Sequence, residues 1–152
     1  MPLTRNIWTR ALWGGVVGIV VEDAILLVGR GAGWVKLDML AIMARLLTSS
    51  TVAATPSGMI LGFVIHLLAG AILALIFAAL VRALHSRHNI IGGLIYGLLL
   101  WILMGAALGP SGVSSAPWSL GTPTTLFTLV AALAYGLVLG YAVSEEAVRQ
   151  TA

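Results

Sequence analysis

Residues 58–78 read GMILGFVIHLLAGAILALIFA and contain no Lys, Arg, Asp or Glu. A helix needs about 20 predominantly apolar residues to cross a bilayer, so this run predicts a membrane span. Its every fourth residue is small apart from one histidine: Gly58, Gly62, His66, Gly70, Ala74 and Ala78. In lipid, small residues at this spacing let helix backbones approach closely and pack. The run therefore predicts a span with one packing face, and that face carries an ionisable side chain.

Three more apolar runs of spanning length occupy residues 11–29, 90–109 and 124–143. Together the four runs predict helices over about 8–29, 57–82, 89–109 and 124–144. The same small-residue spacing recurs in all of them, and we expect these glycines to pack helices together: Gly14, Gly18, Gly58, Gly62, Gly70, Gly93, Gly97, Gly105, Gly136 and Gly140. The predicted fold is an all-α membrane protein, a four-helix transmembrane bundle in one domain over residues 1–152.

The composition excludes several classes of protein. Of 152 residues, 60% are hydrophobic and only 9% are charged, whereas a soluble globular domain carries about 25% charged residues. The net charge of +3 fits basic loops that orient a membrane protein, and we expect no nucleic-acid partner. The absence of cysteine excludes disulfides, thiolate metal sites and cysteine nucleophiles.

The placement of Lys and Arg predicts that both termini lie on the inner side of the membrane. With that orientation the inner side carries Arg5, Arg10, Arg82, Arg87 and Arg149, and the outer side carries Arg30, Lys36 and Arg45. Inner loops of membrane proteins are the more basic ones. We therefore expect an N-in, C-in multi-pass protein.

The segment 34–47, WVKLDMLAIMARLL, is apolar but too short to span. We expect an additional helix that lies in the outer interface between the first two spans, anchored by Trp34. At 100° per residue, Asp38 and Arg45 point the same way while Lys36 falls opposite. A re-entrant or partner-contacting segment is therefore the alternative.

Glu22 and Asp23 lie inside the first predicted span. Each acid near a helix centre costs about 2.5–3.5 kcal/mol on insertion scales, so this helix needs neighbours that solvate the acids. Glu22 continues the series of Gly14 and Gly18 and should face the bundle. Asp23 should lie on the flank of that face, toward another helix, a cavity or a partner subunit.

His66 is predicted to lie within about one helical turn of the depth of Glu22, which is within side-chain reach if their helices pack together. A carboxylate and an imidazole in this position could bind or relay a proton or a cation. Alternatively they are a hydrogen-bonded pair that holds two helices together. A third interpretation makes His66 an axial ligand of a tetrapyrrole, haem or a chlorophyll-type pigment, because small residues flank it on both sides; otherwise we expect no cofactor.

No motif predicts an enzyme. The chain has no Gly-x-Ser-x-Gly, no His-Glu-x-x-His and no phosphate-binding loop. His85 and His88 flank Arg87 in a short connection without further ligands nearby, so we expect a solvated loop and no metal site.

The stretch from Gly58 to Tyr141 resembles the small, uncharacterised YagU-like inner-membrane proteins of bacteria. The likeness lies in these residues: Ile65-His66, Gly70, Ala74-Leu75, Gly93, Tyr96-Gly97, Trp101, Tyr135-Gly136 and Leu139-Gly140. The resemblance implies a membrane fold and a location in a bacterial-type inner membrane, and it implies no reaction. It would place a second histidine at the position of Ala132, which weakens a metal or haem site.

These observations lead to three functional hypotheses. The first is a non-catalytic subunit or scaffold that packs through its glycine faces in a homo-oligomer or a larger membrane complex. The second is a small proton- or cation-coupled transporter or channel that uses Glu22, Asp23 and His66. The third is haem or pigment binding through His66. The expected partners are the lipid bilayer and other membrane subunits or further copies of this chain.

Overall fold

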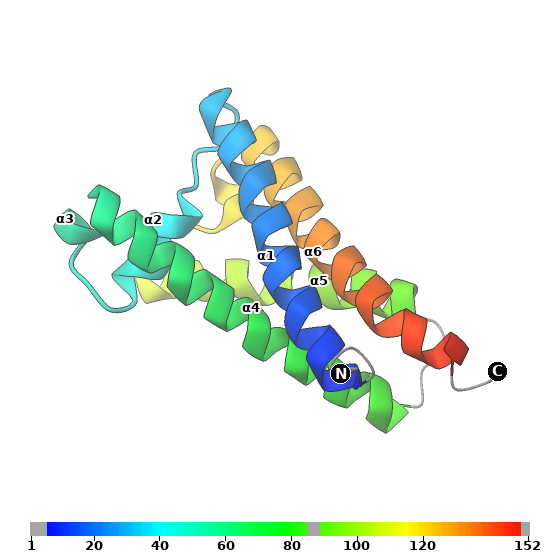
Figure 1. The fold of residues 1–152 in the computed structure, drawn as a ribbon. Helices are drawn as coiled ribbons and strands as arrows, with labels where there is room; N and C mark the ends of the chain where they lie inside the picture. The colour runs from blue at the N-terminus through cyan, green and yellow to red at the C-terminus, as the bar shows by residue number, and fades with distance from the viewer. Residues whose placement is uncertain (1–5, 85–88, 150–152) are drawn as a thin grey trace.

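The computed structural model describes residues 6–84 and 89–149, with side chains described as far as Ser144. Figure 1 shows four long helices: α1 (Ile7–Gly31), α4 (Pro56–Leu84), α5 (Asn89–Ser111) and α6 (Thr122–Arg149). Two short helices, α2 (Met39–Arg45) and α3 (Ser50–Ala53), lie between α1 and α4, and a 3-10 turn, Pro117–Ser119, precedes α6. The predicted loop with His85, Arg87 and His88, and also Arg5, lie outside the described residues.

All four long helices are long and apolar enough to cross a membrane. The predicted fold class, an all-α bundle of four such helices with a short interfacial helix, is therefore confirmed. The helices begin and end within a few residues of the predicted positions because local signals set their ends. Asn6 accepts a hydrogen bond from the backbone of Trp8 at the start of α1, and the Thr55 hydroxyl accepts one from the backbone of Gly58 at the start of α4.

The long helices are arranged in the order α4, α1, α6, α5. Contacts are extensive between α1 and α4, between α1 and α6, and between α5 and α6, whereas α4 and α5 share few. The bundle is therefore an arc with an open side between α4 and α5. In Figure 1, α1 begins and α6 ends at the same end of the bundle, as an even number of crossings requires.

The closest helix approaches occur at glycines. A Cβ atom at Gly93 would meet the backbone oxygen of Gly136 on α6, and one at Gly97 would meet the backbone oxygen of Ala132. The remaining packing glycines contact other parts of the same chain: Gly14 meets Ala142, Gly18 meets Tyr135, Gly58 meets α3, Gly62 meets α2, Gly70 meets Ile19, Gly105 meets Trp118 and Gly140 meets Asn89. Each glycine named in the sequence prediction thus faces a neighbour within this chain.

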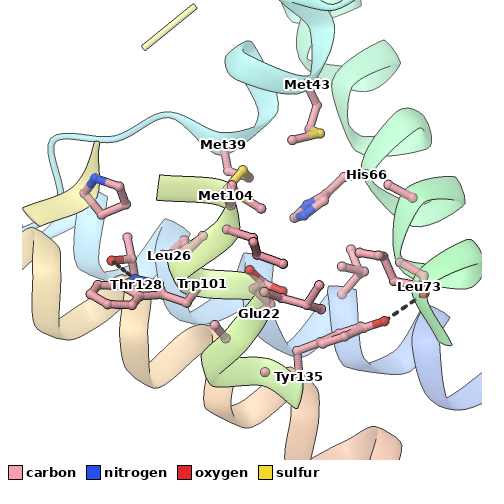
Figure 2. Close-up of a pocket in the computed structure, with 18 residues that line it drawn as sticks. Glu22, Leu26, Met39, Met43, His66, Leu73, Trp101, Met104, Thr128 and Tyr135 are labelled. Carbon is pink, nitrogen blue, oxygen red and sulfur yellow. Dashed lines mark hydrogen bonds between the residues drawn. The ribbon is translucent and has the colours of Figure 1, made fainter. Parts of the chain in front are cut away.

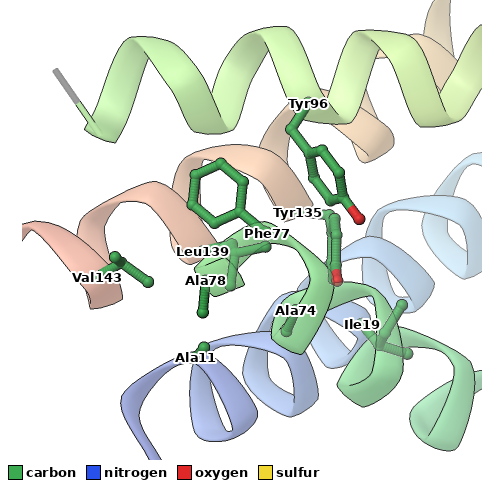
Figure 3. Close-up of a cluster of buried hydrophobic side chains, with 9 residues drawn as sticks. All are labelled: Ala11, Ile19, Ala74, Phe77, Ala78, Tyr96, Tyr135, Leu139 and Val143. Atoms are coloured by element: carbon green, nitrogen blue, oxygen red, sulfur yellow. The ribbon is translucent and has the colours of Figure 1, made fainter. Parts of the chain in front are cut away.

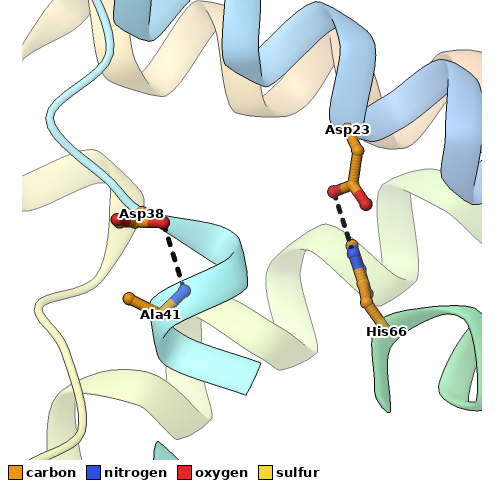
Figure 4. Close-up of polar contacts among 4 residues, drawn as sticks. All are labelled: Asp23, Asp38, Ala41 and His66. Atoms are coloured by element: carbon orange, nitrogen blue, oxygen red, sulfur yellow. Dashed lines mark hydrogen bonds and ion pairs between the residues drawn. The ribbon is translucent and has the colours of Figure 1, made fainter. Parts of the chain in front are cut away.

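The segment predicted as an interfacial helix over 34–47 is helical only over α2, Met39–Arg45. Gly33 adopts a positive φ of 76°, which ends the α1 turn, and residues 34–38 are irregular. Asp38 then accepts a hydrogen bond from the backbone of Ala41 and caps α2 (Figure 4). α2 packs against α4 beside Gly62, and most of its side chains are buried.

A cluster of buried apolar side chains joins α1, α4, α5 and α6 toward the end where α1 begins (Figure 3). Phe77 and Tyr96 bring α4 and α5 together there, with ring centroids 5.2 Å apart. The Tyr96 hydroxyl also donates to the backbone oxygen of Leu73, at 2.8 Å. The open side of the arc is thus closed at this end by the contact of Phe77 with Tyr96 and by the hydrogen bond of Tyr96 to Leu73, and toward the other end by α2.

Candidate functional site

Asp23 and His66 form a buried pair between α1 and α4 (Figure 4). Nδ1 of His66 lies 2.9 Å from Oδ1 of Asp23 and donates to it, and the side chains are only 4% and 5% exposed. The two helices meet through Gly15 and Gly70, whose backbones lie in contact. Close approach of the two helices at these glycines therefore holds the Asp23 and His66 side chains together inside the bundle.

The carboxylate bonded to His66 is that of Asp23, which lies toward another helix, whereas Glu22 continues the face of Gly14 and Gly18 and points into the bundle. The reason is that α1 has two adjacent packing faces. Gly15, Ile19 and Asp23 face α4, whereas Gly14 and Gly18 face α6 through Ala142 and Tyr135. Glu22 lies on this second face, next to the space enclosed by the arc.

Glu22 lines a cavity of about 180 Å³ inside the bundle. Figure 2 shows its carboxyl group and the His66 ring directed into that space. Residues of all four long helices and α2 line the cavity: Ile19, Glu22, Leu26, Met39, Met43, His66, Ala69, Gly70, Leu73, Gly97, Leu100, Trp101, Leu103, Met104, Pro117, Thr128, Ala132 and Tyr135. Glu22 is 7% exposed, and within the described ranges no side chain donates a hydrogen bond to it.

The cavity has an opening on the open side of the arc. Leu103 of α5 lines it and is nevertheless 64% exposed. Ala69 and Leu73 of α4 line the opposite edge and are partly exposed. The space between α4 and α5 therefore connects the cavity to the surface that lipid would cover in a membrane.

Two aromatic side chains that the sequence analysis did not assign to a site form cavity walls. The Trp101 indole N–H donates to Oγ1 of Thr128 at 3.0 Å, which turns the ring inward. The Tyr135 hydroxyl donates to the backbone oxygen of Gly70 at 2.8 Å. Trp101 occupies a position in the small-residue series of its helix, and this was the available signal that it faces another helix.

Asp23 has a second environment on its other side. Its Oδ2 atom is buried without a hydrogen-bond partner among the described residues. A separate space of about 10 Å³ is lined by Asp23 together with Arg30 and Asp38, and these last two side chains form an ion pair at the surface. That volume is close to the minimum that holds one water molecule.

The geometry of the site does not suit a metal or a tetrapyrrole. Within the part of the chain that the structure describes, no group of three or more His, Cys, Asp or Glu side chains could hold a metal ion. A cavity of about 150 Å³ accommodates benzene, so this one, of about 180 Å³, is too small for a macrocycle of four pyrrole rings.

Comparison with known proteins places the chain in a family. Residues 6–151 match the model of DUF6789, a family of unknown function, and the chain belongs to that family. No curated protein and no solved structure matches the chain. The match does not test the resemblance to YagU-like proteins, which stays a prediction.

Proposed function

We propose that this member of the DUF6789 family is a small membrane transporter that exchanges protons or cations at Glu22, Asp23 and His66. One observation carries the proposal: these three ionisable side chains are 7%, 4% and 3% exposed, and two of them line an internal cavity. Ionisable groups inside a membrane bundle are costly and usually mark an ion or proton pathway. A cavity beside them supplies room for a transported molecule.

The charge balance of the site supports exchange. The site contains two carboxyl groups and one imidazole, and no Lys or Arg lines the cavity. When both acids and the histidine are ionised, the site lacks one positive charge. An unpaired buried charge costs several kcal/mol, so a proton on Glu22 or a cation in the cavity must supply the missing charge.

The second environment of Asp23 supports proton access. The small space beside its free Oδ2 atom reaches toward the surface ion pair of Arg30 and Asp38. The Asp23–His66 hydrogen bond then leads from that space to the wall of the main cavity. In the N-in, C-in orientation, which is part of this proposal, protons enter from the outer side of a bacterial-type inner membrane.

The scaffold hypothesis has less support. It rested on glycine faces available to partners, and those glycines contact this chain's own helices. Self-association and assembly with other subunits stay predictions without a specific surface.

Proton movement in proteoliposomes tests the proposal. We expect vesicles loaded with a pH-sensitive dye and with K⁺ or benzyltrimethylammonium, and diluted into medium without that cation, to acidify faster when they contain the protein than when they are empty, because the outward cation gradient drives protons inward. Glu22→Gln and His66→Ala should return the rate to that of empty vesicles. Glu145→Gln, which follows the span predicted over 124–144, is the matched control and should retain the rate. Equal rates in all variants would refute the proposal.

A further inference from the structure

The cavity has properties that define a class of ligand, and they go beyond the presence of ionisable groups. Its size, its walls and its opening each restrict what can bind. The inference below rests on the proposed function, because it names the molecule that would occupy the exchanging site.

The charges around the cavity favour a cation over an anion or a neutral molecule. The ionisable side chains that face it are Glu22 and the Asp23–His66 pair, and Tyr135 on α6, whose hydroxyl donates to Gly70. The lining residues of α2 and α5 carry no charge. Asp23 is already bonded to His66, so Glu22 is the carboxyl group available to a ligand.

The walls favour an organic cation over a metal ion. Apart from Glu22 and His66, the cavity is lined mainly by apolar and aromatic side chains. Trp101 and Tyr135 present rings, and rings attract cations through their π faces. Met39, Met43 and Met104 form another wall (Figure 2), and flexible methionine side chains adapt to apolar ligands of varied shape.

The volume limits the size of the ligand. About 150 Å³ holds one benzene molecule, and the cavity measures about 180 Å³. One compact ring therefore fits, and a larger body would have to extend through the opening between α4 and α5. Because that opening is lined by Leu73 and Leu103, a ligand with apolar surface can enter from the bilayer.

We propose that the cavity binds an organic monocation with one ring, which enters between α4 and α5 and places its charge beside Glu22. Binding of each cation displaces one proton from Glu22 to water, so the net charge of the site stays constant. The exchange of one cation for one proton is the coupling step of the proposed transporter.

Benzyltrimethylammonium is a suitable probe because it has one ring and a permanent charge. We expect saturable binding to the protein in nanodiscs, measured by equilibrium dialysis of the radiolabelled probe. Glu22→Gln should weaken binding by about tenfold or more, because it removes the opposite charge from a poorly solvated site. Glu145→Gln should leave binding unchanged. Tetraphenylphosphonium, with four rings, should not compete.

A second pair of variants tests the opening without changing any charge. Leu103→Trp should reduce binding at least about tenfold by filling the opening, whereas Ile102→Trp, at an exposed neighbour that does not line the cavity, should not. This pair decides the question if Glu22→Gln fails to fold.

Three outcomes would overturn the inference: no saturable binding, equal binding by folded Glu22→Gln, or equal competition by tetraphenylphosphonium. Glu22-dependent proton flux without probe binding would leave the transporter standing and refute the ligand class. Glu22-dependent probe binding without proton flux would support the cation site and refute coupled transport.

Discussion

Replacing Gly93 by alanine is expected to separate α5 from α6, whereas the same change at its neighbour Gly92 is not. A Cβ atom at Gly93 would collide with the backbone oxygen of Gly136 and lie within 3.0 Å of the Gly140 backbone. A Cβ atom at Gly92 would meet only the Phe77 ring, at 3.9 Å, which is ordinary contact. Both positions lie inside α5, so the gain in helix propensity is about the same and cancels between the variants.

The difference between the two variants measures the packing term alone. Adding a methyl group to a well-packed interior costs about 1–3 kcal/mol. We expect the upper part of that range, because backbone atoms on α6 cannot move aside by changing a rotamer. Gly93→Ala should therefore be about 2–3 kcal/mol less stable than Gly92→Ala, a change of more than tenfold in the unfolding equilibrium.

Unfolding in mixed micelles, with helix content followed by circular dichroism during an SDS titration, gives both free energies. Equal stabilities would refute the reasoning, because they would show that α5 and α6 do not approach at this glycine. If Gly93 instead served a partner subunit, the alanine variant would unfold like Gly92→Ala and would lose association. The experiment thus separates packing within the chain from packing between chains.

Three further predictions use the same unfolding assay. A double-mutant cycle of Asp23→Asn and His66→Gln should give a coupling free energy above about 2 kcal/mol, because a charged Asp23–His66 pair attracts more strongly than an ordinary hydrogen bond. Hydrogen bonds between membrane helices average about 0.6 kcal/mol and reach about 1.7 kcal/mol, so a coupling within that range would mean that the pair is neutral. Tyr135→Phe should lose about 1 kcal/mol with its hydrogen bond to Gly70, and an unchanged stability would contradict this role. Ala69→Leu should fill part of the cavity, so we expect higher stability and weaker probe binding. If the variant instead loses both stability and probe binding, the larger side chain has disturbed helix packing, which would contradict this prediction.

Hydropathy and glycine spacing were sufficient to predict the four long helices, because their length and composition follow from the thickness of the bilayer. The short segment after α1 was harder. That prediction treated Trp34 to Leu47 as one interfacial helix, but Gly33 and Asp38 interrupt the helix locally. Burial of α2 also depends on Gly62, which lies on a different helix.

The site was predicted in its members but not in its pairing. Glu22, Asp23 and His66 stood out because charged groups are rare in apolar spans. Adjacent acids point about 100° apart on a helix, and the sequence does not state which neighbour each direction meets. Gly14 and Gly15 both permit close approach, and the fold assigns the first to α6 and the second to α4.

The cavity itself argues for an occupant. At about 24 cal/mol per Å³, empty space of this volume costs up to about 4 kcal/mol, and the opening between α4 and α5 lowers that cost. A larger residue in place of the partly exposed Ala69 on the rim would remove some of the empty space, but the chain has a small residue there. A lipid tail could fill the space, but it would leave the Glu22 carboxyl facing hydrocarbon, at about 2.5–3.5 kcal/mol if ionised. A ligand at 100 times its Kd stabilises a protein by about 2.7 kcal/mol. A monocation offsets both costs at once, because its ring fills the volume and its charge pairs with the acid.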